Sequence, residues 1–377
     1  MLSPEKLLRE LISIPSVNPA FMPDQPDWIG EHRVADFLAH QADRVGLELE
    51  FQKVLPNRSN LLAKLTPAGG RPKQRVLLAP HMDTVGVVDG SKFKPKLVGD
   101  RLFGRGACDT KGSVAAMFSA LMDLARSGTR PKDTEIALLA LVDEENLQKG
   151  SRKFAASKKK ANLAIVGEPT RNKLVTAHKG DFWLRLTTSG KAAHGATPHH
   201  GKNAVHEMAQ AVDLIETKYA KALTRKKHTL LGGPTVNVGV MRGGKQPNIV
   251  PASCEAMIDR RTLPGETEKI VRAELNELFK ARGLSVVISN AKDAPLVALE
   301  TDPGLPLVQS LLKSLRQKQP LGVDFFTDAS HLALGGVPSV VFGPGDIAQA
   351  HTENEWISIK SLNRATAQLT KFLRSLP

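Results

Sequence analysis

Seven histidine and acidic residues could together bind metal ions, because imidazole nitrogens and carboxylate oxygens are donors that suit zinc. They stand at the carboxyl ends of several predicted strands, far apart in the sequence, so only folding can bring them together. The candidates are His81, Asp83, Asp109, Glu144, Glu145, Glu168 and His351. A single histidine or glutamate in such a place is more often a surface or capping residue. Their joint occurrence is what indicates a metal site.

The adjacent acids Glu144 and Glu145 favour the same interpretation. Two neighbouring carboxylates repel each other, and holding both in a dry site is costly unless a cation or a proton offsets the repulsion. A metal ion beside one of them would supply that cation.

The glycine-rich segment GRGACDTKG contains Asp109 and could be mistaken for a phosphate-binding loop. Gly104 and Gly106 form half of a dinucleotide fingerprint, but the acid at position 109 would repel a phosphate, and the Walker pattern is absent. We therefore set nucleotide binding aside. Cys108 has no evident base beside it and is interpreted as a buried, inert thiol.

Four apolar runs lead into these candidates and are interpreted as buried strands, since continuous apolar runs are typical of a parallel sheet. The runs span residues 75–79, 135–142, 163–167 and 338–342. Helical patterns such as 113–127 lie between several of them, so the alternation predicts an α/β fold with a mixed, mostly parallel sheet flanked by helices. In such sheets ligands gather at the carboxyl ends of the strands.

Residues 178–290 follow a different pattern, in which strands alternate between apolar and polar positions. The predicted order of strand, helix, strand, strand, helix, strand is that of a ferredoxin-like α+β domain. These elements are expected at 181–187, 203–219, 235–241, 253–260, 266–281 and 284–289. Because sheet-like signals resume afterwards, we expect a catalytic domain formed by residues 1–177 and 292–377, with residues 178–291 inserted into it.

The composition narrows the classes of function. A chain of 377 residues, 41% of them apolar, is long enough for two or three domains with a substantial core. The net charge of +14 invites a nucleic-acid interpretation. However, the basic clusters lack interleaved aromatic residues, and one tyrosine and three tryptophans offer little for base stacking. We expect no nucleic-acid partner.

The sequence predicts neither export nor membrane insertion. Charged residues interrupt the first twenty positions, so these lack the apolar stretch of a signal peptide. No apolar run approaches the roughly 20 residues that a membrane span needs. Cys108 and Cys254 are the only cysteines, which fits a reducing compartment. We expect a soluble, cytoplasmic protein without a disulfide or a membrane partner.

Several motifs resemble those of the M20 family of metallopeptidases and deacylases, the group of acetylornithine deacetylase and succinyl-diaminopimelate desuccinylase. In chain order they are APHMDTV, GRGACDTKG, LVDEE, VGEPT and AHTENEW. In the insertion, SGKAAHGATPHHGKNAV, PNIVP and DRRTLPGE resemble the family's lid, which also serves for dimerisation. The resemblance covers essentially the whole chain. It implies a zinc-exopeptidase-like catalytic domain and a homodimer formed through the lid.

The metal site of the family maps onto matching positions in this chain. The resemblance implies that Asp109 bridges two zinc ions, that His81 and Glu168 complete one site, and that Glu145 and His351 complete the other. Each ion then keeps open positions, as a catalytic site requires. Two Zn²⁺ per subunit are therefore expected, with Co²⁺ or Mn²⁺ as substitutes.

The resemblance also implies roles for residues near the metals. Asp83 would orient His81. Glu144 would be the general base, taking a proton from the metal-held water and passing it to the leaving amine.

In the lid, His194 resembles the histidine that reaches across a dimer to stabilise the tetrahedral oxyanion. Its alternative interpretation is a polar loop residue. Asn248 and Arg261 match positions that hold the substrate, and the planar fork of Arg suits a carboxylate. Strand alternation predicts that Arg260 points to the opposite face.

The function expected from these features is hydrolysis of the amide bond of an N-acyl amino acid by metal-activated water. The alternative within enzymes is a zinc carboxypeptidase or dipeptidase that acts on a short peptide. A further alternative is a non-catalytic binding protein, whose signature would be loss of the base or of a ligand, and neither is missing. Whether the acyl group is acetyl, succinyl or aminoacyl stays open.

Overall fold

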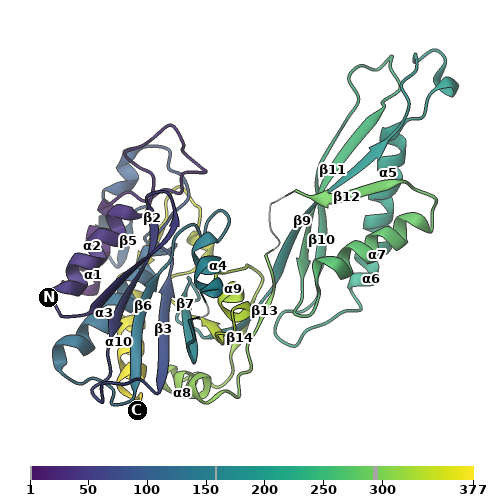
Figure 1. The fold of residues 1–377 in the computed structure, drawn as a ribbon. Helices are drawn as coiled ribbons and strands as arrows, with labels where there is room; N and C mark the ends of the chain where they lie inside the picture. The colour runs from purple at the N-terminus through teal and green to yellow at the C-terminus, as the bar shows by residue number, and fades with distance from the viewer. Residues whose placement is uncertain (1, 158, 292–295) are drawn as a thin grey trace. The chain divides into compact units, whose positions relative to one another are not determined.

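The chain folds into two compact units in the computed structural model, which describes residues 2–157, 159–291 and 296–377 (Figure 1). The stretches of unit 1 are Met1–Thr176, Thr301–Leu321 and Thr327–Pro377, and those of unit 2 are Ala177–Glu300 and Gly322–Phe326. Unit 2 therefore interrupts unit 1 in the sequence. The expected boundaries follow residues 177 and 291, and residues 292–295, next to the second one, lie outside the described residues.

Unit 1 is built on a mixed sheet with a parallel centre. Among the described residues its strand order is β1-β2-β6-β3-β7-β15-β8, with β13 and β14 paired to β8. Strand β3 runs parallel to β6 and β7, and β7 runs parallel to β15. The strands are β1 (Glu48–Leu55), β2 (Arg58–Leu65), β3 (Gln74–Pro80), β6 (Thr134–Ala140), β7 (Leu163–Gly167), β8 (Val175–His178), β13 (Leu299–Glu300), β14 (Leu321–Val323) and β15 (Ser339–Val341).

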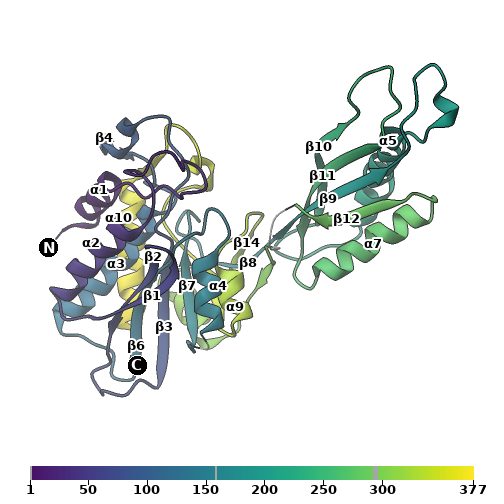
Figure 2. The ribbon, with the colours of Figure 1, turned by 45° about the horizontal axis from the view of Figure 1, so that its top comes forward.

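Helices cover both faces of this sheet (Figures 1 and 2). Alternate residues of a strand point to opposite faces. Val76 and Leu78 of β3 join the large core that α1, α2, α3, α8 and α10 complete, while Leu77 is buried on the face where α9 contacts β7 and β15. The helices are α1 (Pro4–Ser13), α2 (His32–Asp43), α3 (Lys111–Ser127), α4 (Lys149–Ala156), α8 (Pro306–Leu315), α9 (Ala329–Leu334) and α10 (Ile359–Arg374).

Burial on both faces explains why the central strands read as continuous apolar runs. The predicted strands 75–79, 135–142, 163–167 and 338–342 correspond to β3, β6, β7 and β15, and the predicted helix 113–127 corresponds to α3. The expected α/β fold with a mostly parallel central sheet is confirmed.

Unit 2 is a four-stranded antiparallel sheet in the order β10-β11-β9-β12, with helices packed on one face. Its elements follow the predicted order of a ferredoxin-like domain. They are β9 (Gly180–Ser189), α5 (Ala204–Leu214), α6 (Ala220–Leu223), β10 (Thr235–Gly243), β11 (Ser253–Thr262), α7 (Glu268–Lys280) and β12 (Val286–Asn290). Along β11 buried residues alternate with partly buried ones, so the two faces of this strand differ in burial.

A small antiparallel sheet supports the loops of unit 1. Its strands are β4 (Lys96–Val98), β5 (Arg101–Phe103) and β16 (Trp356–Ser358). Strand β5 leads into the GRGACDTKG segment, and β16 follows His351, so pairing of β5 with β16 brings these two segments together. In the described part of the chain, no helix has the length and apolar character to cross a membrane.

Candidate metal centre and active site

Three candidate segments follow neighbouring parallel strands of unit 1. Strand β3 ends at Pro80 and leads into His81, β7 ends at Gly167 and leads into Glu168, and β6 leads into the turn with Glu144 and Glu145. Because the carboxyl ends of parallel strands meet at one edge of the sheet, these side chains lie together there. The other two segments, with Asp109 and His351, come from the loops joined to the small sheet.

Asp109 stands between the two histidines. Its Oδ1 lies 3.2 Å from Nε2 of His81, and its Oδ2 lies 3.4 Å from Nε2 of His351. Nε2 of His351 is also 3.0 Å from Oε2 of Glu145, and Nε2 of His81 is 3.9 Å from Oε1 of Glu168. The structure therefore brings all five candidate ligands together, with one oxygen of Asp109 toward each histidine.

Among the residues that the structure describes, two compact triads that share His81 could hold an ion. His81, Asp109 and Glu145 form one, and His81, Glu144 and Glu168 form the other, with donor atoms within 4.8 Å of one another. These triads differ from the expected division, because they place His81 with Glu145 and include Glu144, which was expected to be a base and not a ligand.

The donor set fits divalent cations. Oε1 of Glu145 and Oε1 of Glu168 are buried and have no hydrogen-bond partner among the described residues. Burial raises the pKa of Glu144 and Glu168 well above the usual range, and burial raises the pKa of Glu145 to about 7. Buried carboxylates at this density need positive charge beyond two histidines to stay ionised, which divalent cations would supply.

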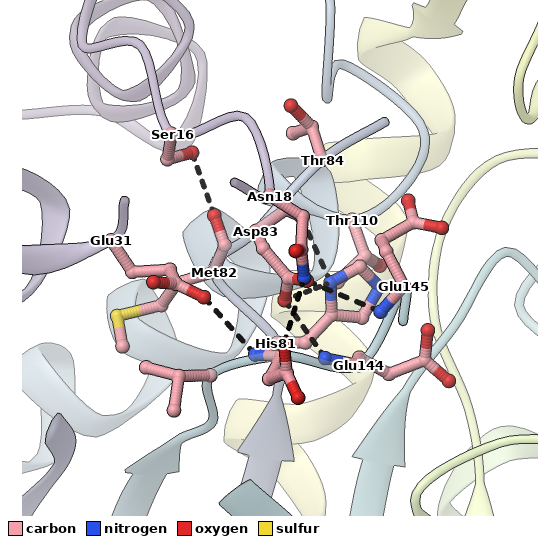
Figure 3. A network of polar contacts seen from close by, with 12 residues as sticks. Ser16, Asn18, Glu31, His81, Met82, Asp83, Thr84, Thr110, Glu144 and Glu145 are labelled. Carbon is pink, nitrogen blue, oxygen red and sulfur yellow. Dashed lines mark hydrogen bonds and ion pairs between the residues drawn. The ribbon is translucent and has the colours of Figure 1, made fainter. Parts of the chain in front are cut away.

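Asp83 contacts both the turn that carries Glu144 and Glu145 and the ring of His81 (Figure 3). Its carboxylate accepts hydrogen bonds from the backbone N–H groups of Glu144 at 3.1 Å and Glu145 at 3.2 Å, and from Nδ2 of Asn18 at 2.8 Å. Nδ1 of His81 lies 3.0 Å from the backbone oxygen of Asp83 and 3.5 Å from Oδ1. Because Asp83 holds Nδ1 of His81, Nε2 of the same ring faces Asp109.

Sequence reasoning missed several buried polar residues around the site. Gln148 donates from Nε2 to Oε1 of Glu144 at 2.9 Å. Glu31 binds Arg58 through two contacts of 2.6 Å and accepts from the backbone N–H of Asp143 at 3.0 Å. Glu355 binds the Asp109 loop and lies in the AHTENEW motif, which was the one available signal for it.

The three lid candidates lie in unit 2. His194 forms a β-bridge with Ile249, and Gly195 N donates to the backbone oxygen of Asn248 at 2.7 Å, so His194 and Asn248 stand on adjacent segments. Arg261 in β11 pairs with Asp259 at 2.9 Å and with Asp181 at 3.5 Å.

The neighbouring Arg260 lies on the buried face of β11, opposite to Arg261, and the opposite direction is what strand alternation predicts. Its Nη2 pairs with Glu266 at 2.7 Å, and its Nε donates to the Tyr219 hydroxyl at 3.1 Å. The adjacent arginines of β11 therefore have different surroundings, since the Arg261 side chain keeps 30% of its surface exposed.

Comparison with known proteins assigns the family. The profile of peptidase family M20/M25/M40 matches residues 77–375. The chain belongs to this family. It is 32% identical to a peptidase M20 domain-containing protein of Schizosaccharomyces pombe, over 88% of this chain and 77% of that protein. It is also 32% identical to the acetylornithine deacetylase of Photorhabdus laumondii, over 94% of this chain and 92% of the relative.

Solved structures of M20 proteins share the fold of this family member. Aminopeptidase PepT from Bacillus cereus matches with a TM-score of 0.80 and 20% identity, over 99% of this chain and 98% of that chain. Together with the deacetylase relatives, membership of the M20 family makes the chain a metal-dependent amide hydrolase. The family resemblance inferred from the motifs is thus confirmed.

Proposed function

We propose that this M20 family member removes the acyl group of an N-acyl amino acid by hydrolysing its amide bond. The observation that carries the proposal is the buried Glu144 beside the cluster of histidines and carboxylates. The similarity to acetylornithine deacetylases over nearly the whole chain supports a deacylase. A carboxypeptidase or dipeptidase would use the same cluster on a peptide.

Two divalent ions are the proposed cofactors, with zinc as the native metal. Asp109 would hold both, His81 and Glu168 would bind one, and Glu145 and His351 would bind the other. The opposed contacts of the two oxygens of Asp109 with the two histidines support this division. When bound, such ions polarise the scissile carbonyl and lower the pKa of water.

Glu144 is the proposed general base. Its Oε1 accepts a hydrogen bond from Gln148, which fixes the carboxylate, and its Oε2 would take a proton from the attacking water. The same carboxyl would then give the proton to the leaving nitrogen. Asp83 would hold the turn of Glu144 and orient His81, as its hydrogen bonds suggest.

Residues of unit 2 are proposed to bind the substrate and the oxyanion. Nδ1 of His194 accepts a hydrogen bond from the backbone N–H of Ala196 at 3.1 Å, so a neutral imidazole would carry its proton on Nε2. That nitrogen could donate to an oxyanion in the partner subunit of a homodimer. Asn248 and Arg261 would bind the substrate, Arg261 through the free carboxylate.

A reducing, cytoplasmic location is proposed as well. Cys108 and Cys254 are both free thiols, and burial raises the pKa of each. Such thiols are inert and suit a reducing compartment.

Side-by-side turnover tests the proposed reaction. N-acetyl and N-succinyl amino acids and dipeptides are offered to the purified chain with zinc, cobalt or manganese, before and after metal removal by a chelator. Faster turnover of the N-acyl amino acids, lost on metal removal, is expected. Turnover of dipeptides alone would assign a peptidase, and activity in a fully metal-free chain would overturn the mechanism.

A further inference from the structure

A buried carboxylate outside the proposed ligand set binds the loop that carries Asp109. Oε1 of Glu355 accepts hydrogen bonds from the backbone N–H groups of Cys108 at 2.7 Å and Asp109 at 2.9 Å. Oε2 accepts from the backbone N–H of Gly106 at 3.0 Å and from Nη1 of Arg105 at 2.7 Å. Four donors of one loop thus converge on one carboxylate.

The shape of this loop needs an acceptor at its centre. Gly106 adopts a positive φ of 81°, which helps turn successive N–H groups inward, and a Cβ there would lie 2.8 Å from Cδ of Lys111. The Glu355 side chain is only 1% exposed, so water cannot replace it readily. Without the carboxylate, several buried N–H groups would lose their partner.

Glu355 also belongs to the segment that carries His351. The backbone N–H of Gly104 donates to the backbone oxygen of Glu355 at 3.1 Å, and Nε2 of His351 lies 3.4 Å from Oδ2 of Asp109. The two segments are therefore joined by backbone, by the Glu355 carboxylate and by their own candidate ligands. Moving one segment would move the other.

We propose that Glu355 is a positioning residue that fixes Asp109 and His351 relative to each other for metal binding. The inference rests on the proposed function, since it takes both residues as ligands. A buried carboxylate with a merely structural role would stabilise the fold but leave the metal affinity of the folded chain unchanged. Because Glu355 accepts a hydrogen bond from the backbone of Asp109, a proposed ligand, its loss should lower the metal affinity as well as the stability of the fold.

Cobalt binding to the metal-free chain tests the proposal. In Glu355→Gln an amide NH₂ replaces one acceptor oxygen and cannot accept from a backbone N–H. The affinity for Co²⁺, followed by visible absorption, should fall about tenfold or more, with an altered spectrum. Glu353→Gln is the matched control, because Glu353 lies in the same segment, is 65% exposed and only approaches Lys92 at 3.7 Å. Its affinity should equal that of the wild type.

Equal cobalt affinities of folded Glu355→Gln and wild type would overturn the inference while leaving the proposed function intact. Failure of the proposed metal centre would show differently, since the wild-type chain itself would bind no cobalt, and failure of the proposed deacylase activity would appear in the turnover assay with cobalt binding unchanged. If Glu355→Gln does not fold, Glu355→Asp decides, because its shorter side chain cannot reach all four donors of the loop. A cobalt affinity about tenfold below that of the wild type supports the positioning role, and an equal affinity overturns it.

Discussion

The carboxylate of Asp83 contacts both backbone N–H groups and a histidine ring. It accepts from the backbone of the turn that carries Glu144 and Glu145, and it faces the ring of His81. Burial acts to raise the pKa of Asp83, but its contacts with His81 and Asn18 lower it below the usual range. The anionic form is therefore the one that organises the site.

The two acids of that turn should respond differently to truncation. Glu144→Ala should lower kcat by about 10²- to 10⁴-fold with metal content nearly unchanged, because this variant lacks the proposed general base but keeps every proposed metal ligand. Glu145→Ala should lower metal occupancy. Kinetics combined with metal analysis of both variants checks this, and the opposite pattern would exchange their roles. The triad of Glu144 with His81 and Glu168 makes the comparison necessary.

Arg261 should discriminate free acids from amides. Arg261→Ala should raise KM for N-acyl amino acids far more than for the corresponding amides, by about tenfold or more, because a charge-assisted contact to the carboxylate is lost. The ion pair with Asp259 gives the residue an alternative, structural role. Equal changes in KM for acids and amides would establish that structural role.

At the scale of elements, a buried ion network holds the turn after β6. Arg58 at the start of β2 pairs with Glu31, before α2, at 2.6 Å and with Asp143 at 3.1 Å, and all three side chains are at most 10% exposed. Arg58→Met would leave two buried carboxylates without their cation. The free energy of unfolding should fall by about 3–5 kcal/mol.

Arg9→Met supplies the control for this network. Arg9 pairs with Glu5 at 2.8 Å within α1, but about a third of each side chain is exposed. Its removal should cost less than about 1 kcal/mol. Urea unfolding of both variants measures the difference, and similar losses would mean that the Arg58 network contributes no more than a surface pair.

His178 in β8 should make stability fall in mild acid. Burial lowers the pKa of His178 to about 4, and the ring keeps a hydrogen bond with the backbone oxygen of Lys179 at 2.8 Å. The unfolded chain binds a proton near pH 6.5 and the folded chain does not, so this stability is complete above pH 6.5 and is lost as pH falls toward 4. The difference between a pKa of 6.5 and one of about 4 makes this loss about 3 kcal/mol.

His178→Gln removes that proton-binding group, so the stability of the variant should depend less on pH than that of the wild type. Unfolding midpoints in urea are compared at several values between pH 7 and pH 4, because other acids titrate in both proteins and only the difference reports on His178. Parallel curves for the two proteins would show that His178 is not buried in its neutral form.

The elements of the core could be predicted from the sequence because their burial leaves a local pattern. Strand β7 coincides with its apolar run, 163–167, since both faces of that strand are covered. The half-buried edge strand β1 has a weaker pattern, and we did not predict it.

Positioning residues could not be predicted in the same way. Glu355 and Asp109 are 246 positions apart, and no periodicity connects a carboxylate with backbone N–H groups of a distant loop. Residue type and strand ends supplied the candidate ligands, and motif resemblance supplied the role of Asp83. The contacts of Glu355, Gln148 and Glu31 appear only when the strands and loops are assembled.

At the scale of the whole molecule, the proposed dimer allows a complementation test. A chain with His194→Ala keeps its metal ligands, and a chain with Glu144→Ala keeps its lid, so neither homodimer should be active. A heterodimer would contain one whole site and should recover up to about half of normal activity. Differently tagged chains establish that subunits have exchanged. Inactive, verified heterodimers would place His194 in its own subunit's site or in none.

The insertion enters and leaves unit 1 at hydrogen-bonded neighbours. Ala177 of β8 faces Glu300 of β13 in the pairing, and the N–H of Thr301 donates to the oxygen of Thr176 at 2.8 Å. A short turn could join these ends without disturbing the central strands, as in proteins that tolerate domain insertion. Unit 1 could therefore accept inserts of different size at this point, so that evolution or engineering could change the inserted unit while the central sheet is kept.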